Sequence, residues 1–233
     1  MMMRSEWGRR VIGAMSVDSC LCCHRELMEE EEMVCLECLM HFPLADSAAR
    51  QNPLWQLLVG KIAFEHATTL AYYQPKDAFA GLIQEAKFKD KPYVNGFLTR
   101  LLVQQLEGSG WPYDIDLIVP VPVHWFRLLR RGYNQVSPIV QTLSEAWHLP
   151  FEKRCLLKKH YAKSQIRVSR EERRQNETGT FCVVHPERLI GKHILLVDDV
   201  STTGSTLLAC ADVLRQVEGV RLSFLTLGLS LHV

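Results

Sequence analysis

The segment 194–206, ILLVDDVSTTGST, ends in a run of small hydroxyl side chains around one glycine. Hydroxyl groups and the unpaired N–H groups at the start of a helix can together bind a phosphate monoester. Gly204 permits the tight backbone geometry that a turn from a strand into a helix requires. The sequence therefore predicts a phosphate site formed by Ser201, Thr202, Thr203, Gly204, Ser205 and Thr206.

Two adjacent acids, Asp198 and Asp199, stand directly before this turn. A carboxylate beside a phosphate is unfavourable unless it binds a different group of the same ligand. Ribose hydroxyls suit it because a carboxylate accepts several hydrogen bonds, and the same oxygens can hold the water shell of Mg²⁺. Each feature alone is typical of an ordinary capped helix, but the combination indicates a sugar-phosphate site.

A second segment whose residue types could bind a ligand is IVPVPVHWFRLLRRGYNQ at 118–135. Proline forces the residue before it into extended backbone, so Val121 and Pro122 are expected to form a rigid loop at the end of a strand. Arg127 and Arg131 offer guanidinium groups that suit phosphate oxygens. A surface helix with basic residues would give the same local composition, and the arginines alone do not separate the two interpretations.

Two CxxC pairs, Cys20/Cys23 and Cys35/Cys38, lie close together near the N-terminus. Five of the eight cysteines fall within residues 20–38 and no secretion signal is evident, which favours a metal site over disulfides. Four thiolates can close a tetrahedral Zn²⁺ site with no open position, so the metal is expected to be structural. Cys22 is an extra thiol that could compete for a ligand position.

Strand-like and helix-like patterns alternate along the rest of the chain. Short apolar runs predict strands at 68–73, 116–121, 181–184, 193–197 and 222–229, and apolar stripes of helical period predict helices around 79–86, 94–102, 136–147 and 207–214. Ser137 and Pro138 are expected to cap and begin the third helix. This alternation predicts an α/β fold with a mainly parallel sheet, whose ligands bind at the carboxyl ends of the strands.

The composition is that of a folded protein, with 233 residues, 47% hydrophobic and 23% charged. We expect a possibly disordered segment at 1–19, a zinc module at 20–45 and a larger domain at 54–233, separated by a polar stretch. The net charge of +1 gives no overall bias towards nucleic acid. No apolar run is long enough to insert into a membrane, and the cytoplasm is the expected location.

The stretch 154–174 carries eight Lys or Arg residues and two acids, without a steady period. Three interpretations remain open. The stretch could be a mobile loop that closes over the site, a track for single-stranded DNA with Tyr161 and Trp125 as stacking platforms, or a solvated basic loop.

The segment 194–206 resembles the phosphoribosyl-pyrophosphate (PRPP) binding motif of type I phosphoribosyltransferases. The string VPVP, the arginine-rich step and RGYNQ at 119–135 resemble the ComF family of competence proteins, as do the CxxC pairs. The segments 71–73 and 81–89, and then Gln165, Arg173 and Asn176, fall in that family's order, although Gln165 follows AKS where relatives often have TPxQ.

The resemblance implies a type I phosphoribosyltransferase-like fold with an N-terminal zinc module. It assigns Asp198 and Asp199 to the ribose of PRPP, residues 201–206 to its 5-phosphate, and Mg²⁺ with Arg127 or Arg131 to its pyrophosphate. It further implies a role in natural transformation, with single-stranded DNA and DNA-uptake proteins as possible partners. The alternative is a catalytically silent module that senses PRPP or a nucleotide and binds DNA.

Overall fold

The computed structural model describes residues 19–75, 77–88, 91–123, 134–158 and 180–230. The chain divides into two compact units, one ending at Phe42 and one beginning at Pro43, which are described separately. The predicted disordered segment at 1–19 lies almost entirely outside the described residues. No helix in the described ranges combines the length and the apolar character that crossing a bilayer requires.

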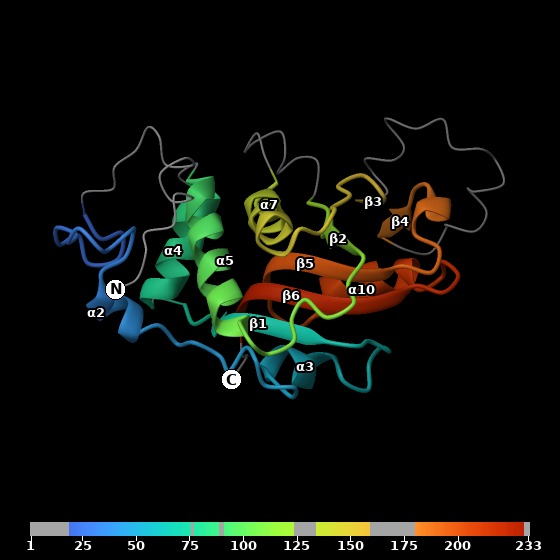
Figure 1. Cartoon of the computed structure of the whole chain (residues 1–233), viewed down its shortest axis with the longest axis horizontal. Coiled ribbons are helices and arrows are strands. Elements are labelled where there is room, and N and C mark those ends of the chain that lie inside the picture. Colours follow the sequence, from blue (N-terminus) through green and yellow to red (C-terminus); the bar gives the residue numbers. More distant parts are fainter. Residues whose placement is uncertain (1–18, 76, 89–90, 124–133, 159–179, 231–233) are drawn as a thin grey trace. The chain divides into compact units, whose positions relative to one another are not determined.

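The larger unit is built on a four-stranded parallel sheet in the order β1-β6-β5-β2 (Figure 1). The strands are β1 (Ala67–Tyr72), β2 (Leu117–Pro120), β5 (His193–Ser201) and β6 (Arg221–Leu229). Their central residues are buried on both faces, which is why the sequence shows continuous apolar runs instead of alternation. The predicted mainly parallel sheet is confirmed, and its carboxyl ends share one edge.

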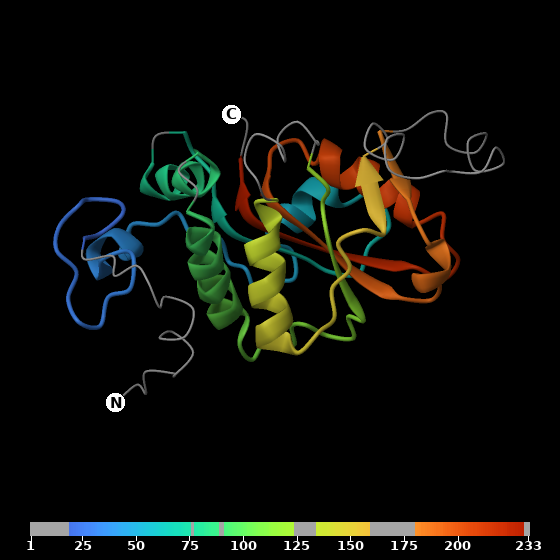
Figure 2. The ribbon, with the colours of Figure 1, turned by 90° about the horizontal axis from the view of Figure 1, so that it is seen from above.

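Helices cover both faces of this sheet (Figure 2). α5 (Pro92–Leu106) and α7 (Val136–Trp147) lie on one face, and α3 (Pro53–Leu58) and α10 (Ser205–Leu214) lie on the other. α4 (Ala78–Phe88) packs beside α5. The predicted apolar stripe of α4 is confirmed, since Phe79, Leu82, Ile83 and Ala86 are all buried.

One predicted cap and one predicted boundary were wrong. The helix predicted at 136–147 is confirmed as α7 (Val136–Trp147), but Ser137 lies inside it and does not cap it; the N-cap is Gln135, whose side chain makes no capping hydrogen bond. Just before the helix, Asn134 Oδ1 accepts a hydrogen bond from the Val136 N–H at 3.0 Å. β5 continues four residues past the predicted end because its pairing with β6 extends to Ser201 opposite Leu229.

The strand predicted at 181–184 is confirmed as β4 (Phe181–Val183), but it pairs antiparallel with β3 (Leu156–Lys158) in a separate two-stranded sheet. The sequence patterns did not predict β3, the 3₁₀ turn at Pro186–Arg188 or α3. α3 begins at Pro53, where Asn52 Oδ1 accepts from the N–H groups of Leu54 and Trp55.

Isolated backbone bridges lie along both lateral edges of the sheet. Beside β1, the Ala45 N–H donates to Leu70 O and the Tyr72 N–H donates to Pro43 O, at 2.9 and 2.8 Å. Beside β2, the Ile118 N–H donates to Pro150 O and Ile118 O accepts from the Glu152 N–H, both at 3.0 Å. These bridges satisfy backbone groups that an edge strand would otherwise leave unpaired.

A polar network joins the amino ends of β5 and β6, in which His193 and Ser223 are buried and Asp114 and Arg221 are exposed. His193 Nδ1 lies 3.0 Å from Asp114 Oδ1, and His193 Nε2 lies 2.8 Å from Ser223 Oγ. Arg221 Nη1 lies 2.6 Å from the other oxygen of Asp114. The order of groups resembles a catalytic triad, but His193 and Ser223 are 0% exposed, so no substrate reaches the hydroxyl. The network is therefore structural.

The hydrogen bond from Arg221 lowers the pKa of Asp114 to about 2, against the smaller opposing effect of desolvation. Because the folded-state pKa lies below the unfolded value of about 3.9, the network stabilises the fold above about pH 4 and loses this contribution as the pH falls through about 2. We predict that Asp114→Asn lowers the free energy of unfolding at pH 7, and that its difference from wild type shrinks between about pH 4 and 2.

Urea unfolding across this pH range measures the effect. Asp212→Asn, which removes an exposed carboxylate from α10, is the matched control. A difference between wild type and Asp114→Asn that is unchanged down to pH 2 would contradict the proposed network.

Candidate functional site

The two predicted phosphate-binding segments meet at the carboxyl edge of the sheet. Pro120 at the end of β2 is in register with Val197 of β5, and the Val121 N–H donates to Val197 O at 2.8 Å. Adjacent strands lie about 4.8 Å apart. The backbone at Val121 and Pro122 therefore lies next to the part of β5 that carries Asp198 and Asp199.

The turn after β5 has the geometry that its small residues suggest. Gly204 has φ +76°, in the left-handed region, and a Cβ added there would lie 3.2 Å from Leu57 Cδ2 of α3. The Thr203 hydroxyl donates to Ser205 Oγ at 3.0 Å. Ser201 and Gly204 are buried, whereas the remaining candidates are exposed at the start of α10: Thr202, Thr203, Ser205 and Thr206. Four hydroxyls are therefore open to a ligand beside the first N–H groups of a helix.

The two acids lie close together at the end of β5. Asp198 Oδ1 accepts from the Asp199 N–H at 2.9 Å, and the Asp198 carboxyl also interacts with the carboxyl of Asp199. Asp199 Oδ2 lies 3.0 Å from Lys87 Nζ of α4. The charge of Asp198 adds to the burial that raises the pKa of Cys210 in α10. The acids thus form one interacting pair between α4 and α10.

The electrostatic surroundings of Asp198 and Asp199 differ. Burial raises the pKa of Asp198 well above its ordinary value, and the charge of Asp199 raises it further. Asp199 instead has a cationic neighbour, and its Oδ1 accepts from the Val200 N–H at 2.7 Å. Its buried Oδ2 receives no aligned hydrogen bond from the described residues, although the ammonium of Lys87 is close. This oxygen lacks an aligned donor of the kind that a hydroxyl group supplies.

Lys87 was not among the predicted site residues. It lies four positions after the buried Ile83, and therefore on the same face of α4. A charged residue at this spacing on the apolar side of a helix needs a partner. This departure from the amphipathic pattern was the signal that could have identified Lys87.

Several predicted residues lie outside the described ranges. These are Arg127 and Arg131 of the arginine-rich step, together with Trp125, Tyr161, Gln165, Arg173 and Asn176. Of the basic stretch 154–174, only residues 154–158 are described. The roles expected of these residues remain predictions.

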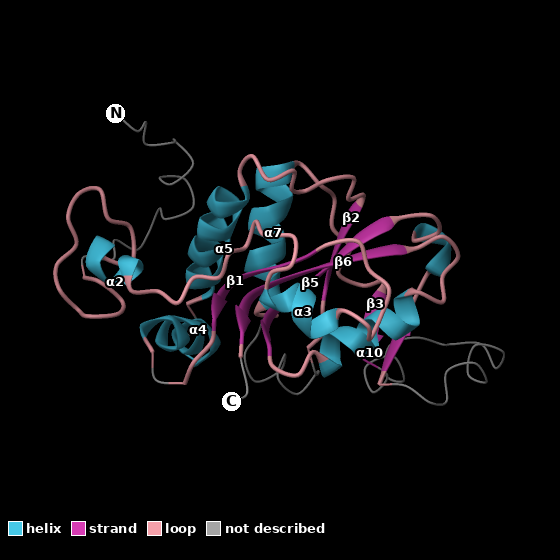
Figure 3. Ribbon diagram, turned by 90° about the horizontal axis from the view of Figure 1, so that it is seen from below, coloured by secondary structure: helices cyan, strands magenta, loops and turns pink. Residues whose placement is uncertain are grey.

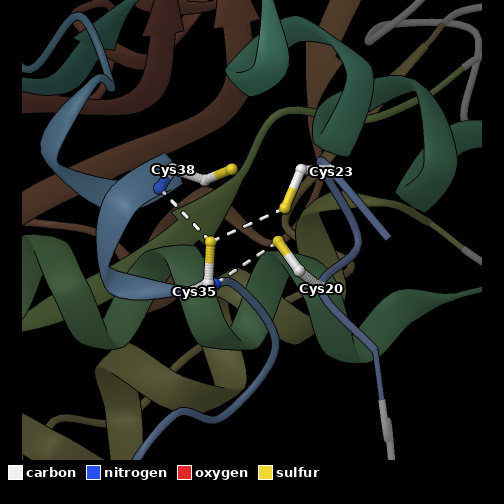
Figure 4. Close-up of side chains that lie close together, drawn as sticks. All are labelled: Cys20, Cys23, Cys35 and Cys38. Atoms are coloured by element: carbon white, nitrogen blue, oxygen red, sulfur yellow. Dashed lines mark hydrogen bonds between the residues drawn. The ribbon is translucent and has the colours of Figure 1, made fainter. Parts of the chain in front are cut away.

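The smaller unit brings the four predicted metal ligands together (Figure 4). The Sγ atoms of Cys20, Cys23, Cys35 and Cys38 all lie within 4.8 Å of one another, and those of Cys23 and Cys35 are 3.7 Å apart. A tetrahedron with Zn–S bonds of about 2.3 Å places its sulfurs about 3.8 Å apart. The cluster can therefore hold a thiophilic metal ion such as zinc.

Backbone groups favour the thiolate form of Cys20 in this cluster. The N–H groups of Cys22 and Cys35 donate to Cys20 Sγ at 3.4 and 3.3 Å, and the Cys38 N–H donates to Cys35 Sγ at 3.4 Å. Burial alone would raise the pKa of Cys20, but hydrogen bonds from the backbone of Cys23, Cys35 and Cys22 outweigh it and lower the pKa to about 6. Burial and the neighbouring cysteines raise the pKa of both Cys22 and Cys38, so the pKa does not separate them; Cys22 is the extra thiol because it is not part of the four-sulfur cluster.

One member of the acidic run 29–32, to which the sequence assigned no function, shapes this unit. Glu31 accepts from Arg25 Nη2 at 2.6 Å and from the N–H groups of Met28 and Leu36 at 2.9 and 2.8 Å. The backbone donors, with Arg25, lower the pKa of Glu31. Glu31 thus fixes the loop that joins the two cysteine pairs, just before α2 (Leu36–Met40).

We predict that metal binding depends on the four cysteines of the cluster and not on Cys22. Cys35→Ser is expected to lower bound metal from about one ion per chain to well below one half, because three thiolates bind a structural metal poorly. Cys22→Ser is the matched control and is expected to keep the full metal content. Metal released on denaturation is the measurement, and equal losses in the two variants would contradict the assignment.

We predict that alanine at Gly204 in the turn and alanine at Gly81 in α4 change the free energy of unfolding in opposite directions. Gly204→Ala is expected to lower the free energy of unfolding by about 1–2 kcal/mol, because alanine is strained at positive φ. Gly81→Ala, in open space on α4, is expected to raise it by about 0.5–1 kcal/mol. Urea unfolding of both variants checks the prediction, and effects of the same sign would contradict it.

Comparisons with known sequences indicate one family. The model of the phosphoribosyl transferase domain matches residues 130–227. Competence protein F of Haemophilus influenzae is 34% identical over 172 residues, which is 72% of this chain and 70% of that protein. DNA utilization protein YhgH of Escherichia coli O157:H7 is 29% identical over 203 residues, or 84% and 83% of the two chains. The match to the solved structure of glutamine PRPP amidotransferase from B. subtilis covers 61% of this chain and 30% of that chain, with a TM-score of 0.40 and 20% sequence identity.

Proposed function

The chain belongs to the ComF family, and from this premise we propose that it binds PRPP and transfers the phosphoribosyl group to a nitrogen nucleophile during DNA uptake and utilization. The observation that carries the proposal is the convergence of two segments at one sheet edge. The acids and hydroxyl-rich turn of 198–206 lie beside the backbone of Val121 and Pro122. This is the edge where parallel α/β sheets bind their ligands.

In the proposed complex, residues 201–206 bind the 5-phosphate. The exposed hydroxyls of Thr202, Thr203, Ser205 and Thr206 support this role, as do the first N–H groups of α10. The left-handed conformation of Gly204 lets the turn close tightly on a phosphate group. Since α10 rests on the same core as α3, the phosphate site has a rigid base.

The acids are proposed to bind the ribose hydroxyls. Asp199 Oδ2 is a buried oxygen without an aligned hydrogen bond, and a ribose hydroxyl would satisfy it. Asp198, whose raised pKa favours the neutral form, can donate as well as accept a hydrogen bond. Two carboxyl groups of different charge fit a sugar phosphate better than two full negative charges would.

The proposed reaction breaks the bond between C1 of the ribose and the pyrophosphate oxygen. The bonding electrons leave with pyrophosphate, positive charge develops on the ribose, and the nitrogen nucleophile bonds to C1. Mg²⁺ enters as part of the PRPP complex and, with Arg127 or Arg131, neutralises the leaving group. The protein contributes positioning and electrostatic stabilisation, which suffices for chemistry of this kind.

The smaller unit is proposed to bind one structural Zn²⁺, supported by the four-thiol cluster and its backbone donors. The names of the relatives, competence and DNA utilization, support a role close to imported DNA. We place this role in the cytoplasm, with single-stranded DNA and DNA-uptake proteins as proposed partners. The basic stretch 154–174 is the proposed contact for such an acidic polymer.

Calorimetric titration of PRPP with Mg²⁺ tests the proposal. Wild type is expected to bind, and Asp198→Asn/Asp199→Asn is expected to weaken binding about 100-fold or more, because one charged and one neutral carboxyl group that bind the ribose are lost. Asp46→Asn, an exposed carboxylate away from the turn, is the control and should bind like wild type. Failure of folded wild type to bind PRPP would refute the proposed function.

A further inference from the structure

The carboxyl edge of the sheet is bordered by a helix that carries a cation into the candidate site. α4 follows β1 and packs beside α5 (Figures 1 and 3). It is anchored by buried Phe79, whose ring would lie 3.5 Å from a Cβ placed on Gly228 near the end of β6. From this anchored start, α4 runs to Lys87 in its last turn. The ammonium of Lys87 is thereby held next to Asp199 by a packed helix.

The ion pair is partly withdrawn from solvent. Lys87 Nζ lies 3.0 Å from Asp199 Oδ2, and the side chains are 23% and 12% exposed. A withdrawn ammonium also interacts strongly with any further anion that reaches it. Lys87 carries three N–H donors on a flexible stem, so an ion pair with one oxygen leaves donors for a second acceptor.

The chemistry of PRPP places such a second acceptor nearby. The hydroxyl on C2 of its ribose, a donor for Asp199, is on the carbon next to C1, which carries the diphosphate. A cation in contact with the carboxylate that binds this hydroxyl is therefore within reach of the diphosphate. Ribose 5-phosphate has the same hydroxyl and the same 5-phosphate but no diphosphate at C1.

Building on the proposed function, we propose that Lys87 selects PRPP over sugar phosphates without a diphosphate: its ammonium binds the C1 diphosphate while Asp199 binds the adjacent ribose hydroxyl. In the ligand-free protein the same lysine screens Asp199. The carboxylate then presents less negative charge to an approaching polyanion. Lys87 is thus a specificity-determining residue as well as the counter-ion of the acid.

Two ligands and three variants test this role by calorimetry on the full chain. Lys87→Met is expected to weaken binding of Mg²⁺ and PRPP about 10- to 100-fold, the effect of one charge-assisted contact, and to change binding of ribose 5-phosphate less than about 3-fold. Lys87→Arg, which keeps the charge, is expected to recover most of the affinity for PRPP. Lys91→Met is the matched control, because Lys91 is 28% exposed and pairs with Glu85 at 2.8 Å instead of Asp199.

The outcomes separate this inference from the proposed function. If wild type fails to bind PRPP, the function itself is refuted. If wild type binds but Lys87→Met binds PRPP unchanged, or loses PRPP and ribose 5-phosphate equally, Lys87 has only a structural role and the inference fails.

A second measurement is made on wild type, so its result does not depend on how well a variant folds. Reductive methylation of wild type with ¹³C labels its lysines, and Lys87→Arg identifies the Lys87 signal by its absence. PRPP and inorganic pyrophosphate are expected to shift this signal, whereas ribose 5-phosphate is expected to leave it in place. A Lys87 signal that does not shift when PRPP is added overturns the inference.

Discussion

The backbone pairing of β5 on both of its sides is the constraint on which the larger unit depends. β5 lies between β2 and β6 and is hydrogen-bonded to each in parallel register. Its first residue, His193, is held by Asp114 and Ser223, and its last, Ser201, is still paired opposite Leu229. The acids therefore belong to the ordered sheet and not to a loop. Their backbone is held by this pairing, which gives a binding site the rigid support that precise chemistry requires.

Patterns in the sequence predicted those parts of the fold that are buried and regular. The runs at 193–197 and 222–229 and the stripe of α4 could be recognised because burial on both faces, or on one helical face, leaves a clear apolar period. α3 and β3 escaped prediction because they are short and lie in polar or basic surroundings. The cap predicted for α7 was wrong because Ser137 already lies inside the helix; its N-cap is Gln135, which is not among the residue types that favour this position.

The candidate site was predicted unevenly for a similar reason. The hydroxyl turn and the four cysteines are local in sequence, so residue type and spacing were sufficient to find them. Lys87 is more than one hundred residues from Asp199, and only the folded sheet brings them together. The inclusion of Asp198 and Asp199 in the ordered sheet depends on how far the pairing of β5 with β6 continues. Glu31 likewise differs from its acidic neighbours only in the backbone donors that the loop presents to it.

The backbone bridges along the two lateral edges of the four-stranded sheet restrict how this protein can bind other molecules. At β2 the backbone of Ile118 is already paired with residues 150 and 152, and Pro120 has no N–H to donate. At β1 the backbone of residues 43–45 occupies the corresponding groups. Within the described residues, both edges are thus poor templates for β-augmentation by an extended peptide or by a second copy of the chain. Recognition of a partner by the sheet unit therefore depends on side chains and loops, which makes it sensitive to sequence in a way that main-chain pairing is not.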